Sequence, residues 1–72
     1  MRQAGFDRQA LREAREHAGL TRREFADAIG RGYTTVAALE NGPGYPSIAA
    51  LNLIAKVLNV RVADLLTEGK RA

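Results

Sequence analysis

The chain has 72 residues, and a chain this short supports one small core, so we expect a single domain spanning 1–72. It has no cysteine and one histidine, which argues against disulfides and against a Cys or His metal cluster, so we expect no metal and no cofactor. Eleven Lys and Arg residues against eight Asp and Glu give a net charge of +3, which permits binding to a polyanion but equally fits an ordinary soluble surface.

The amino-terminal segment carries charges at short intervals and lacks the apolar core of a secretion signal. No stretch of the chain approaches the roughly 20 apolar residues of a membrane span. We therefore expect a cytoplasmic protein that is neither secreted nor inserted in a membrane.

The first predicted helix begins after Asp7, a favourable N-cap residue, and ends at Gly19, which suits a left-handed C-cap. Its inward face is expected to carry Leu11, Ala14 and Ala18 at helical spacing. The charged side chains expected in solvent are those of Arg8, Arg12, Glu13 and Glu16.

The middle of the chain carries two more predicted helices with a sharp turn between them. A Thr-x-x-Glu capping box at Thr21 and Glu24 opens a helix over about Arg22–Ile29. Gly30 supplies the left-handed conformation for the turn, and the next helix spans about Tyr33–Asn41. The side chains predicted to be buried from these two helices are Phe25, Ala26, Ile29, Val36 and Leu39.

The last third of the chain predicts two further helices. The segment Gly42-Pro43-Gly44-Tyr45-Pro46 cannot continue a helix, because its prolines and glycines interrupt the hydrogen-bond ladder, and Ser47 then caps a fourth helix. A short fifth helix is predicted over Val62–Leu66, and the polar tail 67–72 is expected to fray, leaving an ordered core of about 6–66. The inward residues predicted here are Ile48, Leu51, Ile54, Ala55, Leu58, Leu65 and Leu66.

Several of these residues form a discontinuous motif over roughly residues 11–66. The motif reads Leu11-Arg12-x-x-Arg15, Gly19-Leu20-Thr21, Phe25-Ala26, Gly30, Val36-x-x-Leu39-Glu40-Asn41-Gly42, Pro46-Ser47 and Ile54-Ala55-x-x-Leu58-x-Val60-x-x-x-x-Leu65. In this order the motif resembles the helix-turn-helix domains of the phage repressor and Cro family. The resemblance implies an all-α, five-helix, lambda-repressor-like fold whose third helix reads DNA.

The resemblance also implies an ion pair. In that family an arginine of the first helix pairs with the glutamate that ends the recognition helix, which here joins Arg15 to Glu40. Both residues follow inward positions, Ala14 and Leu39, so both stems border the predicted core. The alternative is that both side chains are merely solvated.

The resemblance also implies contacts with the DNA backbone on both sides of the third helix. Arg22, at the amino end of the second helix, would bind a phosphate where the backbone amides also favour an anion. Arg23 and Arg31 would reach neighbouring phosphates, although an exposed Arg23 without a partner fits the sequence equally well. Asn41 and the amides of Gly42 match the loop that touches the backbone in the family. Such contacts position the domain without reading sequence.

The base-reading surface is implied to lie on the first turns of the third helix. Its residues are Tyr33, Thr34, Thr35, Ala37 and Ala38. Family members often carry Gln, Asn, Arg or Lys at these positions. Because this chain offers hydroxyl and methyl groups there, we expect weaker discrimination between bases and a preference for contacts with thymine. Two further departures are Gly32 in place of a Ser or Thr cap, and Arg31 where a small apolar residue is common.

The fourth helix carries an apolar stripe on the side away from Leu51 and Leu58. The stripe comprises Ala49, Ala50, Leu53 and Val57. The stripe has two interpretations. In the first, another element of the same chain covers it; in the second, the stripe and Tyr45 form a surface for self-association or for a protein partner. Operator-binding relatives generally act as dimers on two half-sites, so a homodimer is expected at least on DNA.

The sequence and its resemblance to this family therefore predict a transcriptional repressor that binds specific sites in double-stranded DNA. The protein is expected to be encoded by a bacterium or a phage and to associate with the nucleoid when it is bound. The alternative is a protein-interaction or antitoxin-like module that keeps the fold with weak or non-specific DNA binding. An enzyme is not predicted, because the chain offers no paired carboxylates, no Ser-His-Asp set and no phosphate-binding glycine loop.

Overall fold

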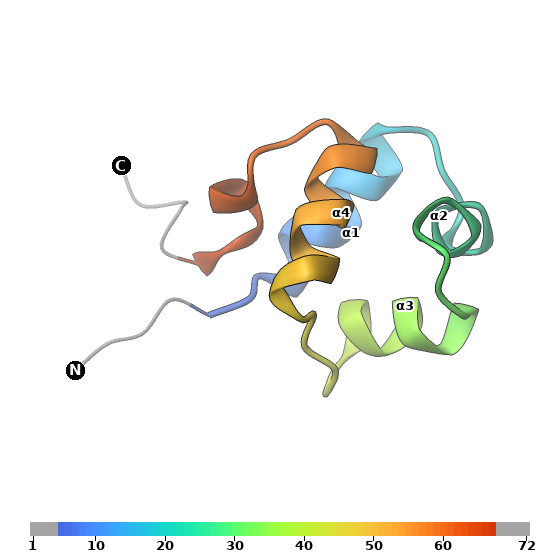
Figure 1. Ribbon diagram of the computed structural model, residues 1–72, viewed down its shortest axis with the longest axis horizontal. Coiled ribbons are helices and arrows are strands. Elements are labelled where there is room, and N and C mark those ends of the chain that lie inside the picture. Colours follow the sequence, from blue (N-terminus) through green and yellow to red (C-terminus); the bar gives the residue numbers. More distant parts are fainter. Residues whose placement is uncertain (1–4, 68–72) are drawn as a thin grey trace.

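The computed structural model describes residues 5–67, and this part of the chain is helical (Figure 1). The elements are α1 (Arg8–His17), α2 (Arg22–Ile29), α3 (Tyr33–Asn41), α4 (Ile48–Leu58) and the 3₁₀ turn η1 (Val62–Leu65). The all-α prediction is confirmed, but the predicted count of five α-helices is wrong, since the fifth element is a single 3₁₀ turn. It stops early because Leu66 adopts an extended backbone and forms an isolated antiparallel bridge with Phe6.

Local side-chain caps start three of the four α-helices. The Asp7 carboxylate accepts from the Ala10 amide at 3.0 Å, and the Ser47 hydroxyl accepts from the Ala50 amide at 3.1 Å. Thr21 and Glu24 form the complete capping box. No side chain caps α3, whose N-cap is Gly32. The α3 helix therefore depends more than its neighbours on tertiary contacts for its position.

The core draws one fully buried side chain from every element. These side chains are Leu11, Phe25, Val36, Ile54 and Leu65, each 0% exposed. Figure 1 shows α2 and α3 on one side of α1 and α4, and η1 on the other side. Because a single cluster joins all five elements, the orientation of α3 depends on the packing of the whole domain.

The ends of the described chain lie side by side. Gly5 and Thr67 exchange two hydrogen bonds, from the Thr67 amide to the Gly5 carbonyl at 2.8 Å and from the Gly5 amide to the Thr67 hydroxyl at 3.0 Å. Thr67, predicted as the first residue of the frayed tail, is thus held by Gly5, and the remainder of the predicted tail, 68–72, lies outside the described residues. None of the helices within 5–67 has the length and apolar character needed to cross a membrane.

Four predicted orientations are wrong, among them that of Arg12, which is half-buried although it was expected in solvent. Ala18 is exposed because it lies at the C-cap of α1, past the core, and Ile48 is 80% exposed. Burial along α4 increases from Ile48 through half-buried Leu51 to fully buried Ile54, so the first turn of this helix projects beyond the core. Arg8, expected in solvent, is partly buried against the end of α3.

Candidate nucleic-acid interface

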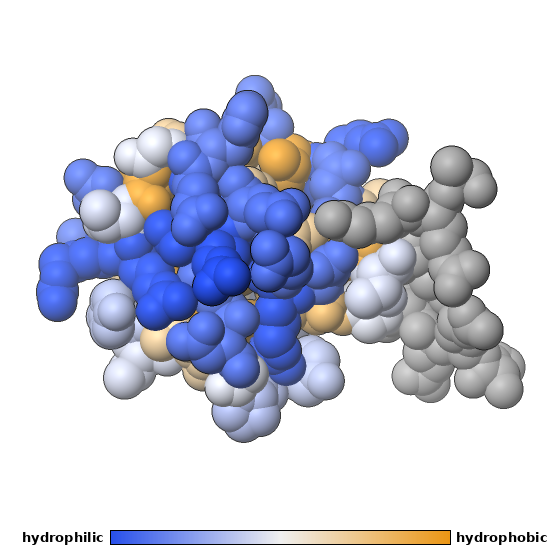
Figure 2. Space-filling view, turned by 180° about the vertical axis from the view of Figure 1, so that it is seen from behind, coloured by the Kyte–Doolittle hydropathy of each residue, from blue (hydrophilic) through white to orange (hydrophobic). Residues whose placement is uncertain are grey.

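The α2–turn–α3 unit exposes one face of α3. Gly30 makes the turn in the left-handed conformation, at φ 68°, where a side chain would be strained. The buried face of α3 consists of Val36, Leu39 and Glu40. Of the predicted base-reading residues, Tyr33, Thr34 and Thr35 are exposed and Ala37 and Ala38 are half-buried. The lower edge of the molecule in Figure 2, where α3 lies, is pale because threonine and alanine have intermediate hydropathy.

A buried carboxylate holds α3 against α1 and α2. The Glu40 side chain is 0% exposed, and its Oε2 accepts from Arg15 Nε at 2.6 Å while its Oε1 accepts from Arg15 Nη2 at 3.2 Å. A third bond comes from Arg22 Nε to Oε1 at 2.9 Å. Arg15 Nη1 also donates to the Leu20 carbonyl at 2.8 Å. One carboxylate therefore ties α3 to the two preceding helices through two guanidinium groups.

Arg22, which was predicted to bind a DNA phosphate, has a partner within the chain, the Glu40 carboxylate. Its side chain is 25% exposed at the first position of α2, and the hydrogen bond to Glu40, with a smaller effect of Tyr33, raises the pKa of Arg22. The contact between Arg22 and Glu40 was not predicted from the sequence. The only signal for it was that a buried carboxylate needs hydrogen-bond donors for both of its oxygens. Arg22 is thus both a structural partner of Glu40 and a cation at a helix amino terminus.

The other predicted phosphate-binding arginines are exposed beside the same turn. Arg23 lies over the Tyr33 ring, 5.5 Å from Cζ to the ring centroid, so it has a partner within the chain. Arg31 is exposed, and its Nη1 donates to the Ile29 carbonyl at 3.4 Å. Tyr33 consequently lies next to both Arg22 and Arg23 at the start of α3.

At the other end of α3, the loop folds back on the helix. Asn41 is exposed, but the amides of Gly42 and Gly44 both donate to the Ala38 carbonyl, at 2.8 and 3.1 Å. The Gly42 amide predicted to contact the DNA backbone is therefore already engaged within the chain. A Cβ on Gly44 would come within 3.0 Å of the Ala38 Cβ, so the loop lies close against the outer face of α3 and Ala38 is half-covered.

The predicted apolar stripe of α4 is half-buried at Ala50, Leu53 and Val57 and exposed at Ala49. Leu53 and Val57 are half-buried and pack against the core, which matches coverage within the chain. Tyr45 and Ile48 are 73% and 80% exposed, and Ala49 is exposed beside them. We call Tyr45, Ile48 and Ala49 the apolar corner; it adjoins the loop that follows α3.

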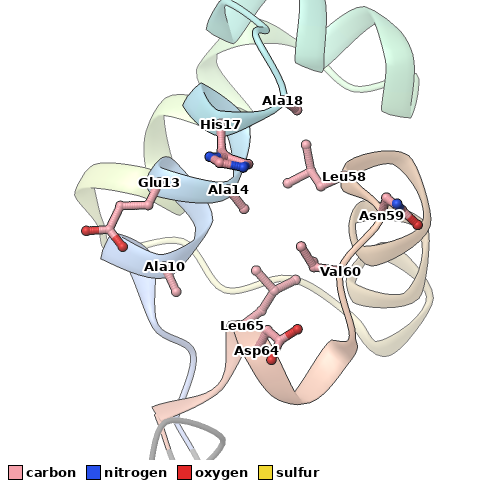
Figure 3. A pocket seen from close by; sticks show the side chains of 10 residues that line it. All are labelled: Ala10, Glu13, Ala14, His17, Ala18, Leu58, Asn59, Val60, Asp64 and Leu65. Atoms are coloured by element: carbon pink, nitrogen blue, oxygen red, sulfur yellow. The ribbon is translucent and has the colours of Figure 1, made fainter.

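A cleft of about 550 Å³ opens between α1 and the α4–η1 segment (Figure 3). Its floor is apolar, with Ala14, Leu58 and Leu65, and Glu13 and His17 stand at its rim. It lies away from the predicted DNA-contacting residues, none of which lines it. Within 5–67, no group of three or more His, Asp or Glu side chains is placed to hold a metal ion.

Comparison with known proteins gives consistent matches. A helix-turn-helix family model, HTH_3, matches residues 11–65. An uncharacterized HTH-type transcriptional regulator from Archaeoglobus fulgidus is 38% identical over 58 residues, which cover 81% of this chain and 83% of that protein.

Solved structures show the same fold. The restriction-modification controller protein C.AhdI from Aeromonas hydrophila is similar with a TM-score of 0.75 and 28% identity, over 81% of this chain and 88% of that one. SinR, a master regulator for biofilm formation solved in complex with DNA, is similar with a TM-score of 0.75 and 27% identity, over 81% and 94% of the two chains.

One similar structure belongs to a larger chain. HppE, solved in complex with substrate, has a TM-score of 0.76 and 32% identity over 82% of this chain, but the match covers only 33% of HppE. The similarity to HppE is therefore confined to one part of that protein, whereas the regulators match over most of their length. Together with the α2–turn–α3 geometry, these matches show that the chain belongs to the HTH_3 helix-turn-helix family, whose members similar to it are transcriptional regulators.

Proposed function

We propose that this chain is a repressor that binds specific sites in double-stranded DNA by inserting α3 into the major groove. The observation that carries the proposal is the exposed face of Tyr33, Thr34 and Thr35 on a helix anchored through buried Glu40. Arg22, Arg23 and Arg31 surround the start of this helix and supply cations for the phosphates on either side of the groove. We place its action in the cytoplasm, on the nucleoid.

The exposed side chains define the readout that we propose. Threonine hydroxyls donate to or accept from either base type, while threonine and alanine methyl groups pack against the thymine methyl. Of the predicted set, Thr34 and Thr35 are the exposed hydroxyls, and half-buried Ala37 contributes a methyl group. We assign Ala38 a smaller part, because Gly44 lies against its Cβ.

Selection from a random duplex library, followed by sequencing, tests the proposal. A specific regulator enriches a short palindromic site with thymines in each half. Salt-sensitive binding without any enriched sequence contradicts sequence-specific regulation. It favours instead a protein-interaction or antitoxin-like module with a protein partner, an alternative supported by the absence of amide and guanidinium side chains among the predicted base-reading residues.

Thr34→Val is expected to relax the preference at one base pair in each half-site. The substitution keeps the shape and removes the hydroxyl, so discrimination at that position should fall by about 1 kcal/mol while other positions keep theirs. Competition binding against a set of single-base operator variants measures this. Asn41→Ala is the control: as a backbone contact it should weaken binding to all duplexes alike. A uniform loss for Thr34→Val would remove Thr34 from the readout.

We further propose that two copies associate through the apolar corner when they occupy adjacent half-sites. The corner holds two large exposed apolar side chains, Tyr45 and Ile48, and follows α3 directly in the chain. A two-fold contact there would set the spacing of the two α3 helices on one face of the DNA.

Ile48→Glu is expected to leave the monomer stable and to reduce cooperative binding to a two-half-site operator, because the new charge would be desolvated only in the dimer. Val57→Glu, at the edge of the core, is expected instead to lower the free energy of unfolding by roughly 2 kcal/mol. Asn52→Glu adds the same charge at an exposed position of α4 and serves as the control. Sedimentation with and without operator, combined with thermal melts, separates the effects. Unchanged cooperativity in Ile48→Glu would move the dimer contact elsewhere.

A further inference from the structure

Arg8 makes a set of contacts that neither the family model nor the sequence pattern includes. Arg8 lies outside residues 11–65, which match the family model, and its position on the first turn of α1 predicted a solvated side chain. Its Nη1 instead donates to the carbonyls of Ala38 at 3.3 Å and Leu39 at 3.1 Å, and to that of Gly44 across the loop. These acceptors lie 30, 31 and 36 residues away in the sequence.

Two of the three acceptors, the carbonyls of Ala38 and Leu39, belong to the last turn of α3. The last carbonyls of a helix carry the negative end of the helix dipole, so a guanidinium there compensates that charge. The Ala38 carbonyl already accepts from the amides of Gly42 and Gly44, and Arg8 adds a further donor to it. The same guanidinium lies 4.8 Å from the centroid of the Tyr45 ring. Arg8 therefore joins α1, the last turn of α3 and both Gly44 and Tyr45 of the loop.

We infer that Arg8 is a positioning residue for DNA binding, an inference that rests on the function proposed above. By holding the α3 carbonyls and the Gly44 carbonyl together, Arg8 sets the path of the loop that begins after Asn41, the exposed residue assigned to the DNA backbone. By stacking on Tyr45, it also sets the orientation of a ring in the apolar corner. A single partly buried side chain of α1 thus contacts both the last turn of α3 and the loop that follows it.

Arg8→Met tests this role because it keeps an unbranched stem and removes every donor. Arg12→Met is the matched control: Arg12 lies one turn further along α1, has no hydrogen bond or ion pair within the described part of the chain, and loses the same charge. Amide exchange at Gly42 and Gly44 reports on the loop, since both amides donate to the Ala38 carbonyl. We expect exchange at these two amides to accelerate about tenfold in Arg8→Met, with the Ile54 amide in α4 unchanged.

Operator binding supplies the second readout. We expect Arg8→Met to weaken affinity about tenfold and Arg12→Met by no more than about threefold, because only the first loses positioning in addition to charge. Arg8→Lys should recover most of the exchange protection and part of the affinity, since an ammonium group has three donors but lacks the planar stacking on Tyr45.

Each other outcome overturns the inference. Equal affinity losses in Arg8→Met and Arg12→Met would mean that only net charge matters. Faster exchange at Ile54 as well as at Gly42 and Gly44 would make Arg8 a general stabiliser of the fold. If the wild-type chain binds no duplex, the proposed function fails, and with it the role of Arg8 in DNA binding. Selective exchange at the two glycines would still establish the contact with the loop.

Discussion

Glu40→Ala is expected to lower the free energy of unfolding by about 3–5 kcal/mol, the cost of leaving a desolvated cation without its partner. Glu40 is fully buried and accepts from both Arg15 and Arg22, so its removal strands one guanidinium that is 9% exposed and frees another that reaches water. A small domain has a total stability of about 5–15 kcal/mol, so a large unfolded fraction is expected at moderate temperature. Urea denaturation followed by circular dichroism measures the change.

The chain offers a close control for Glu40. Glu16 also lies near Arg15, at 3.9 Å from its Nη2, but its side chain is 62% exposed. Glu16→Gln is therefore expected to change stability by less than about 0.5 kcal/mol. If Glu16→Gln and Glu40→Ala change the free energy of unfolding by similar amounts, burial does not determine how much a carboxylate near Arg15 contributes to stability.

A double variant separates the stranded charge from the lost contact. Arg15→Met with Glu40→Met replaces the pair by apolar groups, while Arg22 remains free to turn towards solvent. We expect the double variant to be more stable than Glu40→Met alone, because the buried cation is gone. Additive losses would show that Arg15 and Glu40 do not interact energetically.

Arg22→Ala is expected to weaken binding to operator and to unrelated duplexes alike, with the dependence of log K on log salt reduced by about one. The reason is that a phosphate contact contributes affinity without sequence information. A smaller loss of stability than for Glu40→Ala should accompany it, because Glu40 keeps both hydrogen bonds from Arg15. Fluorescence titrations at several salt concentrations, beside urea melts, provide both quantities.

Arg61→Ala is the matched control for charge. Arg61 is 81% exposed, pairs with Asp64 and belongs to the η1 end of the chain rather than to the α2–turn–α3 unit. Its removal takes away one positive charge and is expected to leave the salt slope nearly unchanged. A loss confined to a single DNA sequence in Arg22→Ala would contradict the phosphate assignment, as would an equal loss in Arg61→Ala.

The sequence predicted the helices and most of the core because their signals are local. Thr21 and Glu24 are three residues apart and form their capping box within one turn, and Phe25 and Ile54 lie on apolar faces with a helical period. The Arg15 and Glu40 contact was reached through the family resemblance, since no local rule joins residues 25 positions apart. Binding of DNA by the predicted residues remains a prediction.

Only the tertiary structure decided which partners the long side chains contact and where the elements end. Helical periodicity defines the direction of a side chain but not where the neighbouring element ends, so it placed Ile48 in the core although the first turn of α4 extends past it. Arg8 and Arg22 reach acceptors up to 36 and 18 residues away, and a flexible arginine adopts such a conformation only when packing brings the acceptors within range. The predicted fifth helix is a 3₁₀ turn that ends at Leu65, because Leu66 pairs with Phe6, which is distant in sequence but adjacent in space. Local sequence thus determined which segments are helical, and packing between distant segments decided which charges hold the reading helix in place.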